Sequence, residues 1–351
     1  MSKVKSTGSA LASALAAVFG KNVEVLGVKM FLDTGFKPLN KALSGNYDDG
    51  LPVGRIVEIF GKESSGKTAI ATNAMISAQK AGGVAMFLDH ERSFMPKLGE
   101  QMGLCIDPAV GNFVHAVPRT FEESMDKMTE YVKLVRENEL IEPSAPIIAV
   151  FDSLAAMVPK SKLAKAAQEQ GMHDSLALAK ACSTCFPVLQ MIADEFNVCI
   201  VFLNQTRTNP QIMMGDSTTT PGGDAKNFYY SIRVALTRKM EKDKEKNVTG
   251  QTIKAKVIKN KVSAPFKEAT WRFNFREDGT GYLDVLGASV DYLIEKNVLK
   301  QRGAYVELNG KKYFRSKLVE VIIENKMEKV IIDMINEKTI AEAAQTEVAE
   351  D

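Results

Sequence analysis

The sequence has few of the residues that build disulfide frameworks or metal centres. It contains 4 cysteines and 3 histidines in 351 residues, and they are scattered along the chain. Cys182 and Cys185 have C-x-x-C spacing, but they lie in an alanine-rich helical pattern and no second pair follows. A zinc site needs two further ligands nearby, and the sequence offers no convincing set. We therefore expect reduced, mostly buried thiols, which suit a cytoplasmic protein.

Long hydrophobic runs and a large net charge are also missing. No apolar run approaches the roughly 18 residues that cross a bilayer, so we expect no membrane span. The formal net charge is only +2, but residues 337–351 carry −4, which leaves +6 on the rest of the chain. A basic body with an acidic tail indicates a polyanionic partner and a built-in competitor for it. The alternative is a tail that only keeps the protein soluble.

The N-terminal residues imitate a secretory signal, because two lysines precede an alanine-rich run. However, Leu11, Leu15, Val18 and Phe19 fall at i, i+4, i+7 and i+8, on one face of a short helix. We therefore expect a small amphipathic helix that docks onto another surface, followed by a strand near residues 23–31.

One stretch fits G-x-x-x-x-G-K-[ST], the loop that wraps the phosphates of a nucleotide. The glycines let the backbone curl so that successive N–H groups face one anion, the lysine reaches the β- and γ-phosphates, and the threonine hydroxyl holds Mg²⁺. The expected nucleotide-binding residues are Gly61, Lys62, Glu63, Ser64, Ser65, Gly66, Lys67 and Thr68. A β-branched run at 54–60 precedes the loop and a helical pattern at 68–81 follows it. This order places the positive end of a helix against the phosphates.

Apolar runs and helical patterns alternate through the middle of the chain. The expected strands are 84–88, 147–151, 198–203, 232–237, 253–258 and 270–275, and the expected helices include 121–137 and 176–195. This alternation predicts an α/β fold, a mostly parallel sheet with helices on both faces and the ligand at the carboxyl ends of the strands. The later runs lack intervening helices, so we expect them to pair antiparallel at an edge.

Loop and turn signals divide the chain into four parts. We expect an N-terminal arm over 1–33, a nucleotide-binding core over 34–280, a small α+β domain over 281–336 and a disordered acidic tail over 337–351. Within the core, residues 159–175 and 206–221 have the glycine, proline and polar content of mobile loops.

Three of the expected strands end in side chains suited to phosphate chemistry. Asp152 follows an apolar strand, where a carboxylate that supports Mg²⁺ belongs. Glu91 follows another and could orient an attacking water; the alternative is a solvated surface charge. Gln205 follows a third and leads into the 206–221 loop, so its amide could hydrogen-bond the γ-phosphate and move that loop.

Taken together, these motifs resemble those of the RecA-type homologous recombinases, and the resemblance runs over most of the chain. It is carried by 51–68, by Leu203-Asn204-Gln205-Thr206-Arg207, by 218–225 with Phe228-Tyr229, and by 257–261 with 264–267. The resemblance implies a bacterial or phage-type member with a RecA-like P-loop NTPase core.

The resemblance also implies roles for individual residues. Glu91 corresponds to the water-activating glutamate, Asp152 to the aspartate that supports Mg²⁺ together with Thr68, and Gln205 to the γ-phosphate sensor. Lys259 and Lys261 match a lysine pair that reaches the nucleotide of the neighbouring subunit. The two loops match the DNA-binding loops, and the N-terminal arm matches the segment that docks onto the adjacent protomer.

The same resemblance predicts the DNA contacts. Basic side chains would contact phosphates, so the affinity for DNA would fall as the salt concentration rises. Apolar side chains of the second loop would separate neighbouring bases, in place of the aromatic side chains on which single-stranded bases usually stack. The expected DNA-binding residues are Lys180, Arg207, Ile212, Met213, Gly222, Gly223 and Arg233.

The sequence departs from the family pattern at three places, one of which is the first loop, where residues 168–173 match only loosely. Met95 and Leu98 stand where the family commonly has an aspartate and a tyrosine at adenine, which leaves the choice between ATP and GTP open. Lys226-Asn227 shifts an expected lysine by one position, so one charge at the subunit interface is missing or moved.

We therefore predict an ATP- and Mg²⁺-dependent, cytoplasmic DNA recombinase. It would form helical filaments on single-stranded DNA and exchange strands with homologous duplex DNA in recombination and repair. Two alternatives stay open: a ring-forming helicase on the same scaffold, and a regulatory protein that binds ATP and DNA without exchanging strands.

Overall fold

The computed structural model describes residues 13, 17, 27–163, 176–208, 218–275, 281–331 and 333–335. The expected amphipathic helix, most of the expected strand at 23–31, the centres of both loops with Ile212 and Met213, and the acidic tail lie outside the described residues. Within the described part of the chain, no helix is long and apolar enough to cross a membrane.

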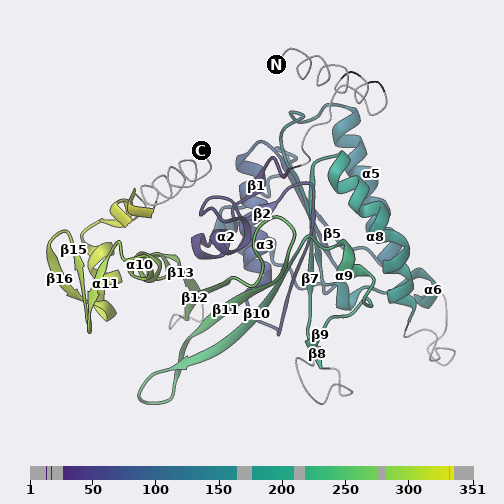
Figure 1. The fold of residues 1–351 in the computed structure, drawn as a ribbon. Coiled ribbons are helices and arrows are strands. Elements are labelled where there is room, and N and C mark those ends of the chain that lie inside the picture. The colour runs from purple at the N-terminus through teal and green to yellow at the C-terminus, as the bar shows by residue number, and fades with distance from the viewer. Residues whose placement is uncertain are drawn as a thin grey trace, which may run out of the picture.

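A nine-stranded sheet forms the centre of the molecule (Figure 1). Its strand order is β13-β12-β11-β10-β3-β7-β6-β4-β5. The parallel strands are β3 (Ile56–Gly61), β7 (Val198–Asn204), β6 (Ile147–Asp152), β4 (Val84–Asp89) and β5 (Phe113–Ala116). Strand β10 (Ile232–Lys242) is parallel to β3 and begins an antiparallel edge with β11 (Val248–Asn260), β12 (Glu268–Phe275) and β13 (Gly281–Asp284). The predicted α/β class and the antiparallel edge are confirmed.

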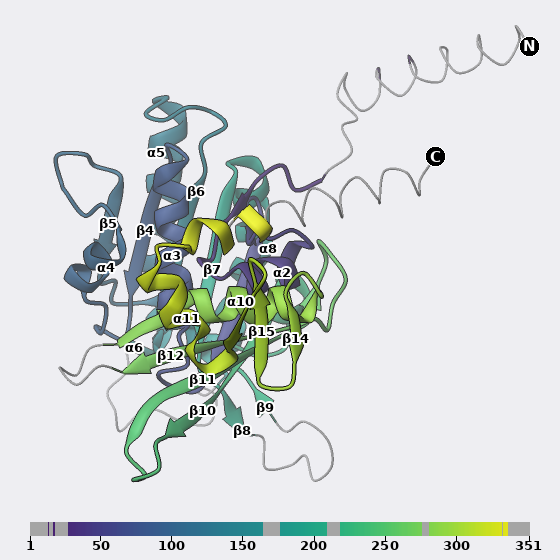
Figure 2. The ribbon, with the colours of Figure 1, turned by 90° about the vertical axis from the view of Figure 1, so that its left-hand side faces the viewer.

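Helices cover both faces of this sheet (Figures 1 and 2). On one face, α2 (Lys37–Ser44) and α3 (Lys67–Lys80) belong to the same core as Val57 and Ile59 of β3; on the other, α5 (Phe121–Glu137) and α8 (Ala177–Glu195) share a core with Ile56. Successive residues of a strand point to opposite faces, so a strand buried on both sides is apolar throughout. This is why the inner parallel strands read as largely apolar runs in the sequence.

Helix α5 has the bounds that the sequence predicts. The side chain of Thr120 accepts a hydrogen bond of 3.1 Å from the backbone N–H of Glu123, which caps the first turn. Phe121, Met125 and Met128 are buried against the sheet, with Val132 and Val135 further along the same stripe. The cap and the stripe together fix where the helix starts and which way it faces.

Several short elements were not predicted. Strand β5 is one; it is partly exposed and lies at the sheet edge, so its sequence lacks the apolar pattern of the inner strands. The others are β1 (Phe31–Leu32), β2 (Leu51–Pro52), α4 (Pro96–Met102), a 3₁₀ turn at Leu154–Ala156, α6 (Lys160–Leu163), β8 (Arg207–Thr208), β9 (Thr218–Thr219) and α9 (Lys226–Tyr229).

The C-terminal elements have their own core and lie at one end of the molecule (Figure 1). They are α10 (Val285–Glu295), β14 (Lys300–Arg302), β15 (Tyr305–Leu308), β16 (Lys311–Phe314) and α11 (Arg315–Glu324). Asn309 and Gly310, both with positive φ, form the turn between β15 and β16. Tyr47, from the segment after α2, is buried in this core and contacts the ring of Tyr292 with centroids 4.4 Å apart.

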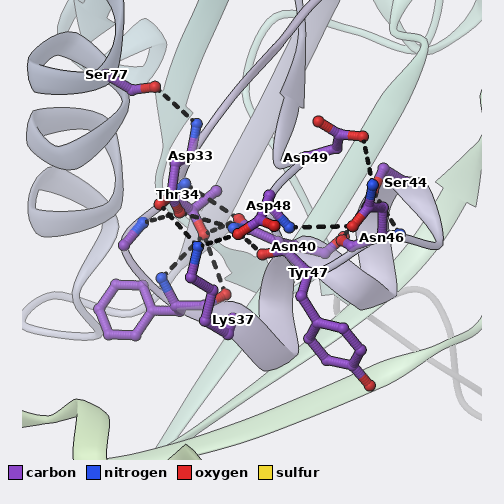
Figure 3. Close-up of polar contacts among 12 residues, drawn as sticks. Asp33, Thr34, Lys37, Asn40, Ser44, Asn46, Tyr47, Asp48, Asp49 and Ser77 are labelled. Carbon is purple, nitrogen blue, oxygen red and sulfur yellow. Dashed lines mark hydrogen bonds and ion pairs between the residues drawn. The ribbon is translucent and has the colours of Figure 1, made fainter. Parts of the chain in front are cut away.

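A buried asparagine ties the start of the core domain together (Figure 3). The Nδ2 atom of Asn40 donates to Oδ1 of Asp33 and to the carbonyl of Tyr47, both at 2.7 Å. Its Oδ1 accepts from the backbone N–H of Thr34 at 3.1 Å and from the Thr34 hydroxyl at 2.6 Å. With four bonds made, Asn40 is satisfied in the interior and links α2 to the segments on both sides of it.

Candidate active site

Four parallel strands bring the expected chemical groups together at their carboxyl ends. Strands β3, β7, β6 and β4 are successive neighbours in the sheet, so their carboxyl ends lie side by side. The phosphate loop follows β3, Gln205 follows β7, Asp152 ends β6 and Glu91 comes just after β4. The carboxyl ends of parallel strands form the usual ligand site of such sheets.

The phosphate loop has the backbone needed to hold an anion. Gly66 adopts φ 88° directly before α3, a left-handed conformation that favours glycine. A Cβ at Gly61 would lie 2.5 Å from the carbonyl oxygen of Leu236, so this position also requires glycine. The hydroxyl of Ser65 is buried and has no hydrogen-bond partner within the described part of the chain. An unpaired hydroxyl at the positive end of a helix fits a phosphate group.

Lys67 lies inside this loop and is held by the loop's own carbonyls. Its Nζ donates to Gly61 at 3.1 Å and to Lys62 at 3.0 Å, and the residue is only 9% exposed. Burial lowers the pKa of the ammonium, while the charges of Asp152 and Glu91 oppose that shift. The ammonium is therefore placed where incoming phosphate oxygens can replace the two carbonyls.

Thr68 and Asp152 meet across the gap between α3 and β6. The threonine hydroxyl donates to Oδ2 of Asp152 at 3.3 Å. Burial raises the pKa of this carboxyl to about 7, with a further contribution from the charge of Glu91, while Lys67 acts in the opposite direction. A buried carboxylate next to a hydroxyl, short of positive charge, is an oxygen donor set that suits a divalent cation. These residues therefore fit the Mg²⁺ of a bound nucleotide.

Glu91 lies at the centre of a second set of contacts. Its Oε1 accepts from the side-chain amide of Gln205 at 2.9 Å and from the hydroxyl of Ser153. The backbone N–H of Glu91 donates to the carbonyl of Asp152 at 3.1 Å, which brings the segment after β4 onto the end of β6. The structure thus places Glu91, Gln205 and Asp152 together. Ser153 was not singled out in the sequence, although it directly follows Asp152.

Asp89, two residues before Glu91, has a structural role. Its carboxylate is buried and accepts the backbone N–H groups of Ser93 at 3.3 Å and Phe94 at 3.0 Å. These bonds fix the turn after β4 that carries Glu91.

A buried polar cluster lies beneath the carboxyl ends of these strands. Glu58 of β3 is fully buried and accepts from Nε of Arg233 at 2.7 Å and from Nδ2 of Asn204 at 2.9 Å, and Nζ of Lys226 lies 3.8 Å from it. Arg233, expected at DNA phosphates, is therefore in a largely buried ion pair, and its DNA contact stays a prediction. The sequence signal for this cluster was a glutamate inside an apolar strand, because such a carboxylate needs partners.

Lys259 and Lys261, at the end of β11 and just after it, lie beside each other away from the phosphate loop. Nζ of Lys261 donates to the carbonyl of Phe228 at 2.8 Å, and Lys259 donates to the carbonyls of Asn227 and Phe228. Burial lowers the pKa of Lys259 to about 8, and the charges of Lys261 and Arg233 add to the effect. No described contact joins this pair to Lys67, so the expected role of the pair needs a second protomer.

A cavity of about 620 Å³ opens beside the phosphate loop. One side consists of Ser64 to Ala69. Apolar side chains from the residue before α2 and from α4, β11 and β12 line much of the rest, namely Phe36, Leu98, Met102, Ile253, Trp271 and Phe273. Leu98 is thus placed where a nucleotide base could pack. Met95, the other residue at the expected base position, is 65% exposed and is not part of this lining.

The remaining expected DNA-binding residues are distributed over several elements. Lys180 is exposed on α8. The backbone of Arg207 pairs with Thr219, so β8 and β9 form a short ribbon at the base of the second loop. Gly222 and Gly223 follow with φ values of 99° and 74°. The structure leaves their contact with DNA a prediction.

Comparison with known proteins agrees with this geometry. The family model for the RecA N-terminal domain matches residues 15–279. Among curated proteins, Protein RecA of Mycoplasma mobile is 32% identical over 305 residues, which cover 85% of each chain. Protein RecA of Acinetobacter baylyi is 32% identical over 307 residues, covering 86% of this chain and 82% of the relative. With the site geometry described above, these matches show that the chain belongs to the RecA family of recombinases.

Proposed function

We propose that this chain is a DNA-dependent ATPase that forms helical filaments on single-stranded DNA and catalyses pairing and exchange with homologous duplex DNA. The single observation that carries the proposal is the contact between Glu91 and Gln205, because it joins the group suited to hydrolysis to the residue that leads into the second loop. A protein that only holds a nucleotide has no need of this connection.

The residues of the phosphate loop would bind ATP. Lys67 would exchange its bonds to the carbonyls of Gly61 and Lys62 for bonds to the β- and γ-phosphates, and the N–H groups at the start of α3 would face the same anion. Thr68 and Asp152 would hold the Mg²⁺, which neutralises charge on the phosphates. Glu91 would orient a water in line with the γ-phosphate and accept its proton.

Lys259 and Lys261 would act on the nucleotide of the next protomer. Both ammonium groups are held by backbone carbonyls near Phe228, whose side chain is 74% exposed. A large apolar side chain in the open beside two cations suits a contact with another subunit. Their charges would stabilise the transferring phosphoryl group, so that hydrolysis depends on assembly.

Gln205 would couple the presence of the γ-phosphate to the conformation of the second loop. Its backbone N–H donates to Oδ1 of Asn204 at 3.0 Å, and Nδ2 of Asn204 donates to the carbonyl of Pro221 at 3.3 Å. A movement of Gln205 would therefore displace both ends of the 206–221 segment. Residues 159–175 and 206–221, with Lys180, Arg207, Ile212, Met213, Gly222, Gly223 and Arg233, are proposed to meet the DNA.

The domain assignment completes the proposal. Residues 1–33 would form the arm that docks onto the adjacent protomer, 34–280 the ATPase core, 281–336 the small C-terminal domain and 337–351 an acidic competitor for DNA. The protein would act in the cytoplasm, where both ATP and chromosomal DNA are available.

The test measures binding to a labelled single-stranded oligonucleotide with a slowly hydrolysed ATP analogue, with ADP and without nucleotide, followed by electron microscopy. We expect tight binding and helical filaments only with the analogue. The Lys67→Ala variant, in which the phosphate contact is removed, is expected to lose this dependence. Equal binding in all three states would overturn the proposal; closed rings would favour a helicase, and isolated protomers a regulatory protein.

A further inference from the structure

Lys226 is a buried lysine that the proposed ATPase mechanism does not use. It is the first residue of α9, directly after the segment that ends the second loop, and it is 0% exposed. Its Nζ donates to Oγ1 of Thr220 at 2.9 Å and to Oδ1 of Asn227 at 3.2 Å. A lysine is almost never fully buried without a specific partner, so its position calls for a reason.

The negative charge of Glu58 does not explain why Lys226 is buried. Glu58 already pairs with Arg233 at 2.7 Å and accepts from Asn204, whereas Lys226 stands 3.8 Å away. The burial of Lys226 lowers its pKa; the charge of Glu58 opposes that shift and the charge of Arg233 adds to it. Two cations facing one carboxylate make the second cation costly, so what Lys226 contributes must come from its other contacts.

Those contacts are with the returning end of the second loop. Thr220 is buried and immediately follows β9, whose Thr219 pairs with Arg207. The stem of Lys226 also packs on Gly222, where an added Cβ would lie 3.0 Å from Cδ and Cε of the lysine. Lys226 thus touches the loop end through both its ammonium group and its methylene groups.

The same cluster holds the outgoing end of the loop. Asn204, the last residue of β7, donates from Nδ2 to Glu58 and to the carbonyl of Pro221. Glu58 therefore lies between the strand that leads to Gln205 and the residues by which the loop returns. A nucleotide-driven shift at Gln205 can move the loop as a unit only if the returning end is also fixed.

We propose that Lys226 is a positioning residue that anchors the returning end of the DNA-binding loop through Thr220, so that the loop follows the nucleotide state. This inference rests on the proposed function, because it concerns how the same loop grips single-stranded DNA. Lys226 itself does not touch the DNA, since its side chain is enclosed by protein.

The test uses the full chain and four variants: Lys226→Met, Thr220→Val, the double variant, and Thr220→Ser, which keeps the hydroxyl. Lys226→Met leaves the Glu58–Arg233 pair intact, so the fold is expected to persist, and Thr220→Val is nearly isosteric. Lys127→Met and Thr129→Val on α5 are matched controls for the loss of a lysine charge and of a threonine hydroxyl.

We expect Lys226→Met and Thr220→Val each to weaken oligonucleotide binding in the ATP-analogue state about tenfold, the size of one hydrogen bond to a charged group. The double variant is expected to lose no more than Thr220→Val alone, because that variant already removes the Lys226 contact together with the 3.4 Å bond that Nη2 of Arg233 donates to the same hydroxyl. Thr220→Ser and the controls are expected to stay within about twofold of the parent chain, and the affinity for the analogue itself is expected to be unchanged.

The salt dependence separates positioning from direct contact. The slope of log K against log salt is negative. Removing a lysine that contacts a phosphate reduces the magnitude of this slope by about 0.7 for a single strand, whereas removing a buried anchor leaves the slope unchanged. A reduced slope, additive losses in the double variant, or full affinity in both single variants would overturn the inference. If Lys226→Met fails to fold, the comparison of oligonucleotide affinity between Thr220→Val and Thr220→Ser tests the inference instead. A parent chain that binds DNA equally in all nucleotide states would remove the proposed function as well, whereas a responsive parent with unaltered variants removes only this anchor.

Discussion

The side-chain amide of Gln205 donates a hydrogen bond of 2.9 Å to Oε1 of Glu91, across the end of the strand that separates their own two strands in the sheet. Ser153, directly after the intervening strand, donates to the same oxygen. In this arrangement the amide of Gln205 is engaged with the residue proposed to orient water. A γ-phosphate that draws the amide toward itself would free Glu91 and move the start of the second loop in one step.

Glu91→Gln is expected to keep nucleotide binding and nearly abolish hydrolysis. The amide preserves the size of the side chain and can still contact Ser153, but it cannot accept a proton from water, and general-base catalysis typically contributes about 100-fold or more. Phosphate release under saturating ATP and single-stranded DNA measures turnover, and electron microscopy checks that assembly persists. Hydrolysis at the parent rate would remove Glu91 from this role.

Gln205→Ala is expected to uncouple DNA binding from the nucleotide. Without the amide, neither Glu91 nor a γ-phosphate can bias the loop, so the ratio of oligonucleotide affinities with the ATP analogue and with ADP should fall towards one. Fluorescence anisotropy in the two states gives the ratio directly. Gln101→Ala, at an exposed position on α4, serves as a control for the loss of a glutamine amide. A ratio like that of the parent chain would contradict a sensing role.

Assembly is expected to weaken as the pH rises through about 8. Lys259 has a pKa of about 8 in the free chain, so it is charged below that pH and increasingly neutral above it. If its ammonium meets a phosphate across the interface, affinity should be flat below pH 8 and then fall by up to about tenfold per pH unit. Light scattering with the ATP analogue between pH 7 and roughly 9.5 follows this change.

Lys259→Arg provides the control, because a guanidinium stays charged throughout that range. This variant should assemble with little pH dependence. The same fall with pH in Lys259→Arg would assign the titration to another group.

Asn40→Ala is expected to destabilise the fold by about 2–6 kcal/mol. The substitution removes four hydrogen bonds in a buried site, each with a net contribution of about 0.5–1.5 kcal/mol, and leaves the Thr34 N–H without its acceptor. Urea unfolding followed by circular dichroism measures the change. Asn138→Ala on the surface at the end of α5 should cost less than about 1 kcal/mol. Equal costs at the two positions would mean that the Asn40 network contributes little.

Removal of residues 337–351 is expected to raise affinity for single-stranded DNA at low salt. The segment carries −4, while the rest of the chain carries +6, so its removal takes away a competitor for the basic surface. The gain should disappear at high salt, because screening weakens both interactions. Unchanged binding at low salt would leave the tail as a solubility device.

Much of the site was predictable because its residues are close in sequence or sit at strand ends. The phosphate loop is a contiguous motif, and Asp152, Glu91 and Gln205 each follow an apolar run. The pairing of Asp89 with Asp152 in the register of β4 and β6 then brings the strand ends together. That register depends on the whole sheet, so the contact between Ser153 and Glu91 had no signal in the sequence.

A glutamate inside an apolar strand indicates that Glu58 needs buried partners, but the identity of those partners was not predictable, for two physical reasons. Arg233 lies opposite Glu58 in the register of β10 and β3, so an arginine that reads as a surface cation is held by a buried carboxylate. Lys226 stands one residue from the expected lysine position, and one residue on a helix rotates a side chain by about 100°. That rotation turns the ammonium from the half-buried position that Asn227 now occupies into the interior.

The order of strands in the sheet has a consequence for biosynthesis. Residue 56, at the start of β3, pairs with residues near 200 on one side, and Val57 pairs with Ile232 on the other. The strand that carries the phosphate loop therefore leaves the ribosome long before either neighbour has been translated. Until β7 and β10 emerge, an apolar strand with two open edges must be shielded by transient collapse or by a chaperone, and the nucleotide site forms among the last parts of the core to be completed.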